Sequence, residues 1–210
     1  MTPVRRCPRV AAALLAVLCA RAAYAGMVTV NVTTRSGATV EDTVIVFDPL
    51  DAAPAASHSA AIIDQINKRF VPRVSVVRTG TTITFPNSDH IRHQVYSFSQ
   101  AKTFALKLYA GSPKTPVNFD QPGLVVLGCN IHDTMVAFVA VVDSPYFAKT
   151  TDSGVAILDL PAGRYRLRTW HPNAVAVIPA REITVPAAPL SVPLAIDVDS
   201  ASATVAAWPE

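Results

Sequence analysis

Three residues on one short stretch of the chain could bind a soft metal ion together. The sequence C-N-I-H-D-T-M places a thiol at Cys129, an imidazole at His132 and a thioether at Met135. Two histidines and one cysteine around the metal, with a weak axial methionine, form the ligand set of copper sites that transfer electrons. The stretch therefore supplies three of four such ligands, and a second histidine must come from elsewhere.

The missing histidine is predicted upstream, in the segment T-I-T-F-P-N-S-D-H-I-R-H-Q-V. His93 follows Asn87 by six residues, at the end of an alternating apolar run that we expect to be a strand. His90 is the alternative first ligand, three residues earlier on the same loop. The count from Asn87 favours His93, which leaves His90 as a solvated loop residue or as a pH-responsive neighbour that contacts the ligands.

The first 25 residues have the three parts of a secretory signal. Three arginines open the chain, an apolar run follows over residues 10–20, and A-Y-A precedes Gly26. We expect cleavage after Ala25 and a periplasmic location. The formal net charge of +3 then falls to −1, because the signal holds four arginines and no acidic residue.

Cleavage would also remove Cys7 and Cys19, so that Cys129 is the only thiol of an exported chain. It cannot then form an internal disulfide. A lone cysteine can simply be a small buried hydrophobe. The neighbouring His132 and Met135 favour a metal ligand instead.

Several classes of function have no basis in the sequence. No basic run interleaved with aromatic residues follows the signal, so we expect no nucleic-acid binding. No later apolar stretch is long enough for a membrane span in the mature chain. The chain has no His-x-His pair, haem-binding Cys-x-x-Cys-His, His-Glu-x-x-His or Gly-x-Ser-x-Gly motif, so we expect that it is not an enzyme.

The residue pattern predicts an all-β protein. Seventeen prolines interrupt any long helical pattern, and residues 60–67 carry only a weak helical signal. Alternating or continuous apolar runs predict strands at 28–33, 44–47, 74–77, 82–85, 124–127, 136–142, 164–169 and 174–178.

Residues 62–142 resemble the cupredoxins, most closely the amicyanin and plastocyanin group. The stretch V-V-R-T-G-T-T-I-T-F-P-N-S-D-H-I-R-H-Q-V fits the family's strand, glycine turn and second strand, followed by an asparagine and the first ligand, here His93. Two residues separate Cys129 from His132, and two separate His132 from Met135, as in amicyanins. The resemblance implies a Greek-key β-sandwich with one type 1 copper per chain, which carries single electrons between a redox protein donor and an acceptor.

The same resemblance implies two supporting roles. Asn87 would tie the loop of the first histidine to the loop of Cys129, and so fix the direction of the ligands. The imidazole edge of His132 would lie near the surface as the exit of the electron. The chain departs from the family at Ile131, where proline is usual, and at Gln94, where asparagine is common. These departures bear on the potential and the partner and remove no ligand.

The two flanks resemble parts of a carboxypeptidase regulatory-like or transthyretin-like sandwich. V-T-V-N-V-T-T-R-S-G-A-T-V, from Val28, resembles its opening hairpin. The segment from Thr150 resembles its continuation, with a turn at Gly154 and a later strand that has Tyr165 and Leu167 on one side. Either the flanks form an accessory sandwich into which the cupredoxin domain is inserted, or the chain is one enlarged sandwich with extra edge strands.

The resulting prediction has four parts: a signal peptide (1–25), an N-terminal β hairpin (26–58), a cupredoxin domain (59–143) and C-terminal regulatory-like strands (144–210). This layout resembles secreted chains labelled methylamine utilization protein. We expect an exported blue copper protein that carries one electron at a time. The alternatives are a copper-binding or delivery protein without electron transfer, and a secreted β-module that docks a partner. The oligomeric state is open.

Overall fold

The computed structural model describes residues 25–51, 59–113, 115–199 and 205–209. Every regular element within these ranges is a strand, so the predicted all-β class is confirmed. No helix of the described residues has the length and apolar character to cross a bilayer. The predicted signal peptide, apart from Ala25, lies outside the described residues, as do Cys7, Cys19 and His58.

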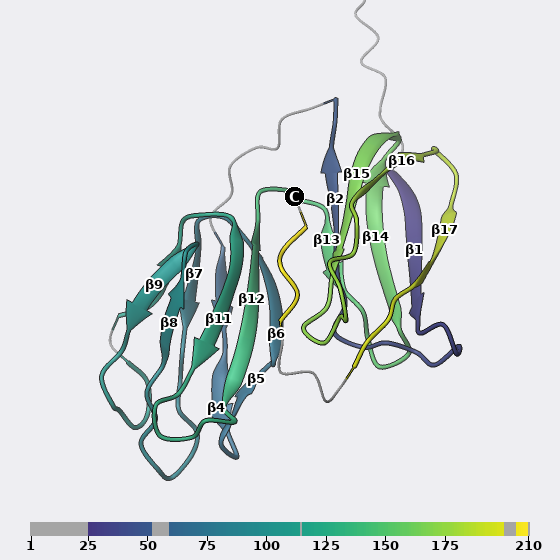
Figure 1. Ribbon diagram of the computed structural model, residues 1–210. Coiled ribbons are helices and arrows are strands. Elements are labelled where there is room, and N and C mark those ends of the chain that lie inside the picture. Colours follow the sequence, from purple (N-terminus) through teal and green to yellow (C-terminus); the bar gives the residue numbers. More distant parts are fainter. Residues whose placement is uncertain (1–24, 52–58, 114, 200–204, 210) are drawn as a thin grey trace, which may run out of the picture.

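Two lobes lie side by side, and each is built around two larger sheets (Figure 1). The central lobe is formed by residues 60–142. The flank lobe is formed by residues 25–49 together with residues 144–195. Segments at opposite ends of the sequence therefore share the flank lobe, and the central lobe lies between them in the chain.

The central lobe has a five-stranded sheet in the order β6-β12-β11-β8-β9 and a three-stranded sheet in the order β10-β7-β3, with a separate β4-β5 hairpin. The bounds of these strands are β3 Ala60–Ile62, β4 Asp64–Ile66, β5 Arg69–Val71, β6 Val74–Arg78, β7 Thr81–Thr84, β8 Tyr96–Ser99, β9 Lys102–Ala105, β10 Val117–Phe119, β11 Gly123–Gly128 and β12 Val136–Val142.

Alternate residues of the paired strands β11 and β12 form the core of the central lobe. Val125 and Leu127 point inward from β11, and Val139 and Val141 do so from β12. Period-two alternation puts every second side chain of a strand on the same face. The apolar cluster continues past the ends of these strands into the loop that joins them.

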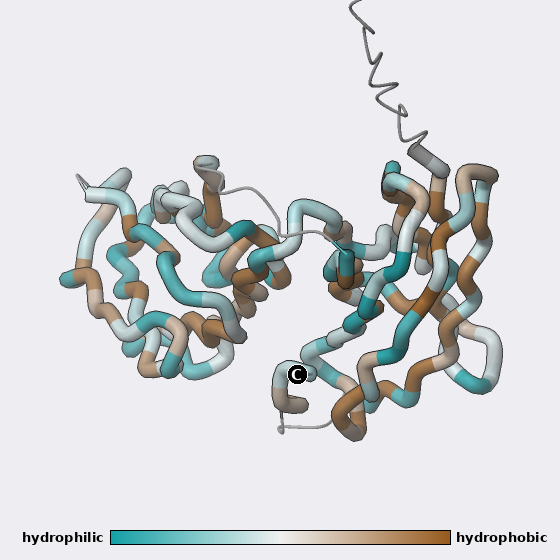
Figure 2. The backbone as a smooth tube through the Cα atoms, turned by 90° about the horizontal axis from the view of Figure 1, so that it is seen from above, coloured by the Kyte–Doolittle hydropathy of each residue, from teal (hydrophilic) through white to brown (hydrophobic). Residues whose placement is uncertain are grey.

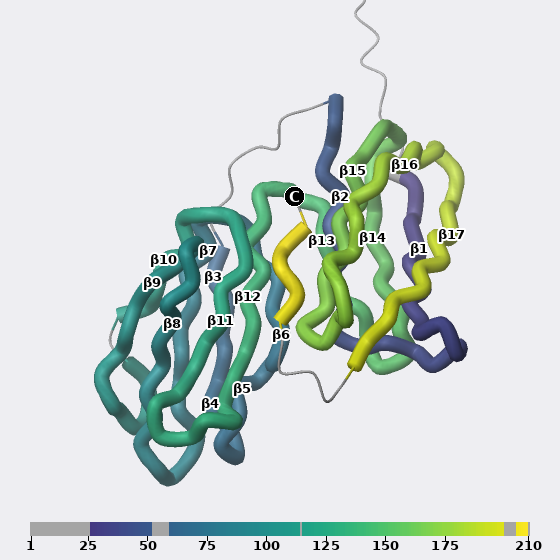
Figure 3. Tube along the Cα trace, viewed as in Figure 1, coloured from purple at the N-terminus to yellow at the C-terminus, as the bar shows by residue number. Residues whose placement is uncertain are grey.

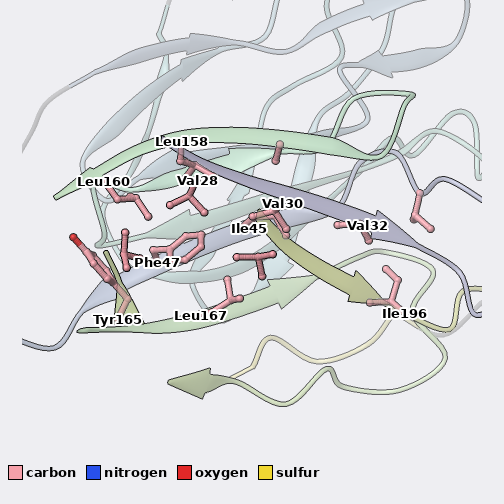
Figure 4. Packing of buried hydrophobic residues seen from close by; sticks show 14 residues of the cluster. Val28, Val30, Val32, Ile45, Phe47, Leu158, Leu160, Tyr165, Leu167 and Ile196 are labelled. Carbon is pink, nitrogen blue, oxygen red and sulfur yellow. The ribbon is translucent and has the colours of Figure 1, made fainter. Parts of the chain in front are cut away.

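The flank lobe has the sheets β14-β1-β17 and β13-β2-β15-β16. Strand β1 pairs antiparallel with β14 and parallel with β17, so one sheet joins residues from both ends of the chain. Figure 4 shows the core between the two sheets, where valines of β1 meet Phe47 and leucines of β14 and β15. The bounds are β1 Ala25–Thr33, β2 Val44–Pro49, β13 Phe147–Lys149, β14 Val155–Pro161, β15 Gly163–Trp170, β16 Arg181–Val185 and β17 Leu190–Ala195.

The predicted N-terminal hairpin is wrong, because β1 and β2 lie in different sheets. The turn at Gly37, which has a φ of 91°, closes only the short bridge between Thr33 and Thr39. The chain then crosses to the opposite sheet, and Val40 is buried in the core on the way. The strands on either side of residue 162 are likewise not a hairpin, since β14 pairs with β1 and β15 with β2 and β16.

One further expectation, a strand at 174–178, is wrong, and one weak signal has no matching element. The weak helical signal at 60–67 corresponds to β3 and β4, because β3 pairs with β7 and β4 with β5. The strand expected at 174–178 is absent from the described residues, where Ala174 makes a single bridge to Val198. Val175 and Val177 are 63% and 47% exposed, so the alternating apolar side chains of this segment do not pack in a core.

The lobes share an apolar junction. On β2, Ile45 and Phe47 face the flank core, while Val44 and Val46 face the central lobe. Strand β12 is also buried on both faces. Burial on both faces explains why both strands are continuous apolar runs.

The C-terminal segment is part of the junction and lies where the lobes meet in two views (Figures 2 and 3). The indole Nε1–H of Trp170 donates a hydrogen bond of 2.9 Å to the carbonyl of Ala206. The ring of Trp170 lies 5.6 Å from that of Phe138 and 6.3 Å from that of Trp208. This aromatic contact joins β15, β12 and the end of the chain.

Candidate metal centre

The four predicted ligands lie on two loops of the central lobe. His93 lies in the loop between β7 and β8. Cys129 follows β11 directly, and His132 and Met135 lie in the loop that leads into β12. His93 is not at the end of a strand as expected, since β7 ends at Thr84 and His93 instead makes an isolated bridge to Tyr109.

The structure brings three of these side chains together. One ring nitrogen of His93, the sulfur of Cys129 and one ring nitrogen of His132 all lie within 4.8 Å of one another. The Cys129 sulfur is 3.9 Å from Nδ1 of His93, and the centres of the two imidazole rings are 5.1 Å apart. His93 and Cys129 are buried, and His132 is half-buried. Of the two candidate first ligands, His93 is the one in this group.

The chemistry of the group fits a metal ion. Nδ1 of His132 is buried and has no hydrogen-bond partner in the structure. Cys129 is a free, buried thiol. Buried polar atoms of proteins are nearly always hydrogen-bonded, and an exception calls for an explanation such as an ion. A thiolate with two imidazoles is a donor set suited to copper.

Met135 is buried beside this group, with 1% of its surface exposed. It belongs to the same apolar cluster as Cys129. Its backbone N–H donates to the carbonyl of His132 at 2.9 Å, which closes the loop between the two residues. The thioether is therefore held in the apolar core at the end of the lobe that carries the other three side chains.

Gly128 allows a close contact immediately before Cys129. A Cβ atom at this position would lie 2.7 Å from the ring of Tyr96. Strand β8, which carries Tyr96, pairs with β11 at this residue. A side chain at Gly128 would require the ring of Tyr96 to move away from the strand end that precedes Cys129.

Asp89 contacts His93 from the side away from Cys129, which the sequence did not predict. Its Oδ2 atom lies 2.8 Å from Nε2 of His93, and only 13% of its side chain is exposed. Burial raises the pKa of Asp89, but hydrogen bonds from the N–H of Lys68, the imidazole of His93 and the N–H of Asn67 outweigh burial and hold the pKa below its ordinary value. The carboxylate form is thus the favoured one.

Asn87 fixes the loop of His93, although not in the way that the resemblance implied. Its side-chain N–H groups donate to the carbonyls of Ile91 at 2.9 Å and Tyr109 at 3.0 Å. Its side-chain oxygen accepts a bond from the N–H of Asp89 at 3.0 Å. These bonds tie the loop to the segment of Tyr109, where a tie to the loop of Cys129 was expected.

A buried polar network supports the same loop. Gln65 donates from Nε2 to the hydroxyl of Tyr109 at 2.5 Å, and that hydroxyl donates to the carbonyl of Phe85 at 2.6 Å. Burial raises the pKa of Tyr109 to about 12, against the opposing effect of the Gln65 hydrogen bond. Gln65 follows Ile63 at an inward-facing alternate position, which is the one sequence signal for its burial. No spacing in the sequence points to Tyr109.

The other histidines of the described residues have different positions. His90, the alternative first ligand and predicted neighbour of the site, is exposed, and the contact to His93 comes from Asp89 instead. His171 is buried in the flank lobe, where its Nδ1 accepts a bond from the N–H of Asn173 at 3.1 Å. Burial lowers the pKa of His171. A structural role for His171 agrees with this position.

Copper proteins are among the solved structures to which part of this chain is similar. No model of a known protein family matches the chain, and no curated protein matches it. A copper-containing nitrite reductase from Thermus scotoductus is 22% identical, with a TM-score of 0.38, over 45% of this chain and 25% of that one. A purple cupredoxin from Nitrosopumilus maritimus is 23% identical, with a TM-score of 0.35, over 40% of this chain and 99% of the cupredoxin.

An amicyanin variant in its reduced Cu(I) form is also similar. It is 22% identical, with a TM-score of 0.35, over 47% of this chain and 98% of the amicyanin. Solved cupredoxins are thus among the proteins to which part of this chain is similar. This chain spans only a quarter of the nitrite reductase, and the cupredoxins match less than half of this chain.

Proposed function

We propose that the protein is an exported one-electron carrier that holds a single type 1 copper ion. His93, Cys129 and His132 are its strong ligands, and Met135 is the weak fourth. The observation that carries this proposal is the convergence, within 4.8 Å, of two imidazole nitrogens and a thiol from two loops. A copper ion bound there would supply a one-electron couple between Cu(I) and Cu(II).

The scaffold supports this function because a sheet positions the loop that carries three of the ligands. Cys129 and Met135 flank the antiparallel ladder of β11 and β12, which pairs Gly128 with Val136. The spacing between the start and the end of the ligand loop is thus set by a sheet. Because the ligands are held in place, little has to move when the charge of the site changes by one electron.

Burial supports the function in a second way. His93 has no exposed surface, Cys129 has 3% and Met135 has 1%. This burial keeps water from the thiol, whose oxidation requires access. His132 is half-buried, and the adjacent Ile131 is 53% exposed, so the second histidine reaches towards the surface. We assign electron exchange with a donor and an acceptor protein to this edge.

The test is the visible spectrum of the purified protein with Cu(II). We expect the intense band of thiolate-to-copper charge transfer, and its reversible loss on reduction. Cys129→Ser removes the thiolate and should abolish the band. His93→Ala should disrupt the site, whereas the matched variant His90→Ala should keep the band, because His90 is exposed.

The other outcomes overturn the proposal in distinguishable ways. Tight binding of Cu(I) without the band on oxidation would indicate a copper delivery protein. No uptake of either ion would indicate a secreted β-module that docks a partner. Retained colour in His93→Ala, with loss in His90→Ala, would overturn the choice of the first ligand.

A further inference from the structure

We propose that Asp89 is a positioning residue for the copper site. It holds His93 with Nδ1 towards the metal, and its negative charge favours the Cu(II) state. The inference rests on the proposed function and deepens it, because it assigns a determinant of the potential to a residue outside the ligand set.

The first step is the direction of the imidazole. Oδ2 of Asp89 lies 2.8 Å from Nε2 of His93, and Nδ1 of the same ring lies 3.9 Å from the sulfur of Cys129. A carboxylate only accepts hydrogen bonds, so the ring nitrogen that faces Asp89, Nε2, carries a proton. In the tautomer that can bind a metal, the lone pair is then on Nδ1, which faces the thiol of Cys129.

The second step is the fixing of the carboxylate itself. Oδ1 of Asp89 accepts a bond from the N–H of Asn67 at 2.6 Å, and Oδ2 accepts one from the N–H of Lys68 at 2.9 Å. Both donors are backbone groups of the turn between β4 and β5. Both residues have a positive φ, 53° and 59°, as in the two-residue turns that join antiparallel strands. The hairpin therefore holds the carboxylate, and the carboxylate holds the ring.

The third step is the effect of the charge. A carboxylate that accepts a hydrogen bond from a ligating histidine makes the ring a stronger donor, and loss of such a partner costs about 10- to 100-fold in metal affinity. Asp89 is only 13% exposed, so solvent screens its charge incompletely. A negative charge beside the site stabilises the doubly charged ion more than the singly charged one. Asp89 thus lowers the reduction potential.

The decisive variant is Asp89→Asn, which removes the charge and keeps the shape. We expect the charge-transfer band to persist and the potential, measured by redox titration, to rise. The affinity for Cu(II) should fall about 10- to 100-fold, with a smaller change for Cu(I). Asp89→Glu, which keeps the charge, should restore the potential towards that of the wild type.

Two matched variants separate this effect from looser packing and from general charge. Ser88→Ala removes a 2.7 Å bond from the Ser88 hydroxyl to Asp64, which joins the same loop to the same hairpin without contacting His93. Asp133→Asn neutralises an exposed carboxylate on the loop of His132. Both should leave the potential at the wild-type value. An equal rise in either variant would overturn the inference.

A measurement without copper tests the same contact. Nitrogen-15 NMR of histidine in the metal-free wild-type protein should show the proton of His93 on Nε2 and protected from exchange. A proton on Nδ1 and none on Nε2 would overturn the inference, and this readout decides it even if Asp89→Asn fails to fold.

Failure of the inference is distinguishable from failure of the proposed function. A wild-type protein that stays colourless with Cu(II) overturns both. A coloured wild-type protein that shares one potential with a coloured Asp89→Asn variant overturns only the role of Asp89.

Discussion

The two lobes are both sandwiches with valine-rich cores, but they use buried polar side chains differently. In the flank lobe, the hydroxyl of Ser144 donates to the carbonyl of Phe47 at 2.6 Å, and the hydroxyl of Thr150 donates to that of Val40 at 2.8 Å. These groups satisfy the backbone. In the central lobe, Nδ1 of His132 is buried without a hydrogen bond. The hydroxyl of Thr43 in the flank lobe is also buried without a partner. What distinguishes the central lobe is that its unpartnered nitrogen lies with a second imidazole and a thiol, which together could bind a ligand.

The lobes are nonetheless one structure in terms of packing. Both β2 and β12 are buried on the face that they turn to the other lobe. The chemistry is therefore local to one end of the central lobe, while stability is shared across the junction. Variants at the junction, in the flank lobe and at the site should separate these two properties.

The largest loss of stability is expected for Trp170→Ala at the junction. Trp170 is 1% exposed and contacts the rings of Phe138 and Trp208. Removal of such a side chain costs about 3 to 5 kcal/mol. Denaturant unfolding should show a single transition at lower denaturant concentration. Two separate transitions, with the copper-bound lobe unaffected, would show that the junction does not couple the lobes.

A smaller loss is expected for Ser144→Ala in the flank lobe. This change leaves the buried carbonyl of Phe47 without its side-chain donor, which costs about 1 to 3 kcal/mol. The charge-transfer band and the potential should stay unchanged, because the change is confined to the flank lobe. Ser112→Ala, at an exposed position of the central lobe, is the control and should have little effect on unfolding. A changed spectrum in Ser144→Ala would contradict the separation of chemistry and scaffold.

Short-range pattern predicted the strands better than it predicted their partners. The expected strand at 136–142 coincides with β12, and the run at 44–47 lies within β2. The pairing of β1 and β2 as a hairpin was wrong, because residues 40–43 cross between sheets. Local alternation reports which faces of a strand are buried and does not report which strand lies next to it.

The prediction of the site has the same limit: the sequence indicated the residues but not all of their neighbours. His93, Cys129 and His132 were predicted from residue type and spacing, since the chemistry of copper restricts the ligands. Asp89 was missed because its role depends on a hairpin that begins 25 residues upstream, at Asp64. Gln65 and Tyr109 were missed because the hydrogen bond between them joins residues 44 apart in the sequence. Supporting contacts come from the tertiary fold, which a motif does not encode.

Met135→Leu tests whether Met135 belongs to the ligands of the site or only to the apolar core around them. Leucine fills a similar volume, so the loss of stability should stay below about 1.5 kcal/mol. The band should persist because the three strong ligands remain. We expect the potential to rise, because the weak thioether donor is lost. Cyclic voltammetry measures this shift, and Met27→Leu, at a position 48% exposed in the flank lobe, is the matched control. An unchanged potential in Met135→Leu would remove Met135 from the ligand set.

The smallest effect is expected for Lys68→Gly, and its sign is favourable. Lys68 has a φ of 59°, in the left-handed region, which costs a residue with a side chain about 1 to 2 kcal/mol. Glycine relieves this cost but loses more backbone freedom on folding, about 0.5 to 1 kcal/mol. The net gain should be about 0.5 to 1 kcal/mol in the free energy of unfolding, measured with denaturant.

The potential of Lys68→Gly should equal that of the wild type, which separates it from Asp89→Asn. The contact to Asp89 comes from the backbone N–H of residue 68, and glycine keeps that donor. Lys107→Gly is the control, since it removes a lysine of the same lobe without relieving a left-handed conformation. A rise in potential for Lys68→Gly alone would show that the rigidity of the turn, beyond its two N–H donors, sets the position of the carboxylate. An unchanged potential with a more stable fold would show that the backbone of the hairpin is sufficient to hold Asp89 against His93.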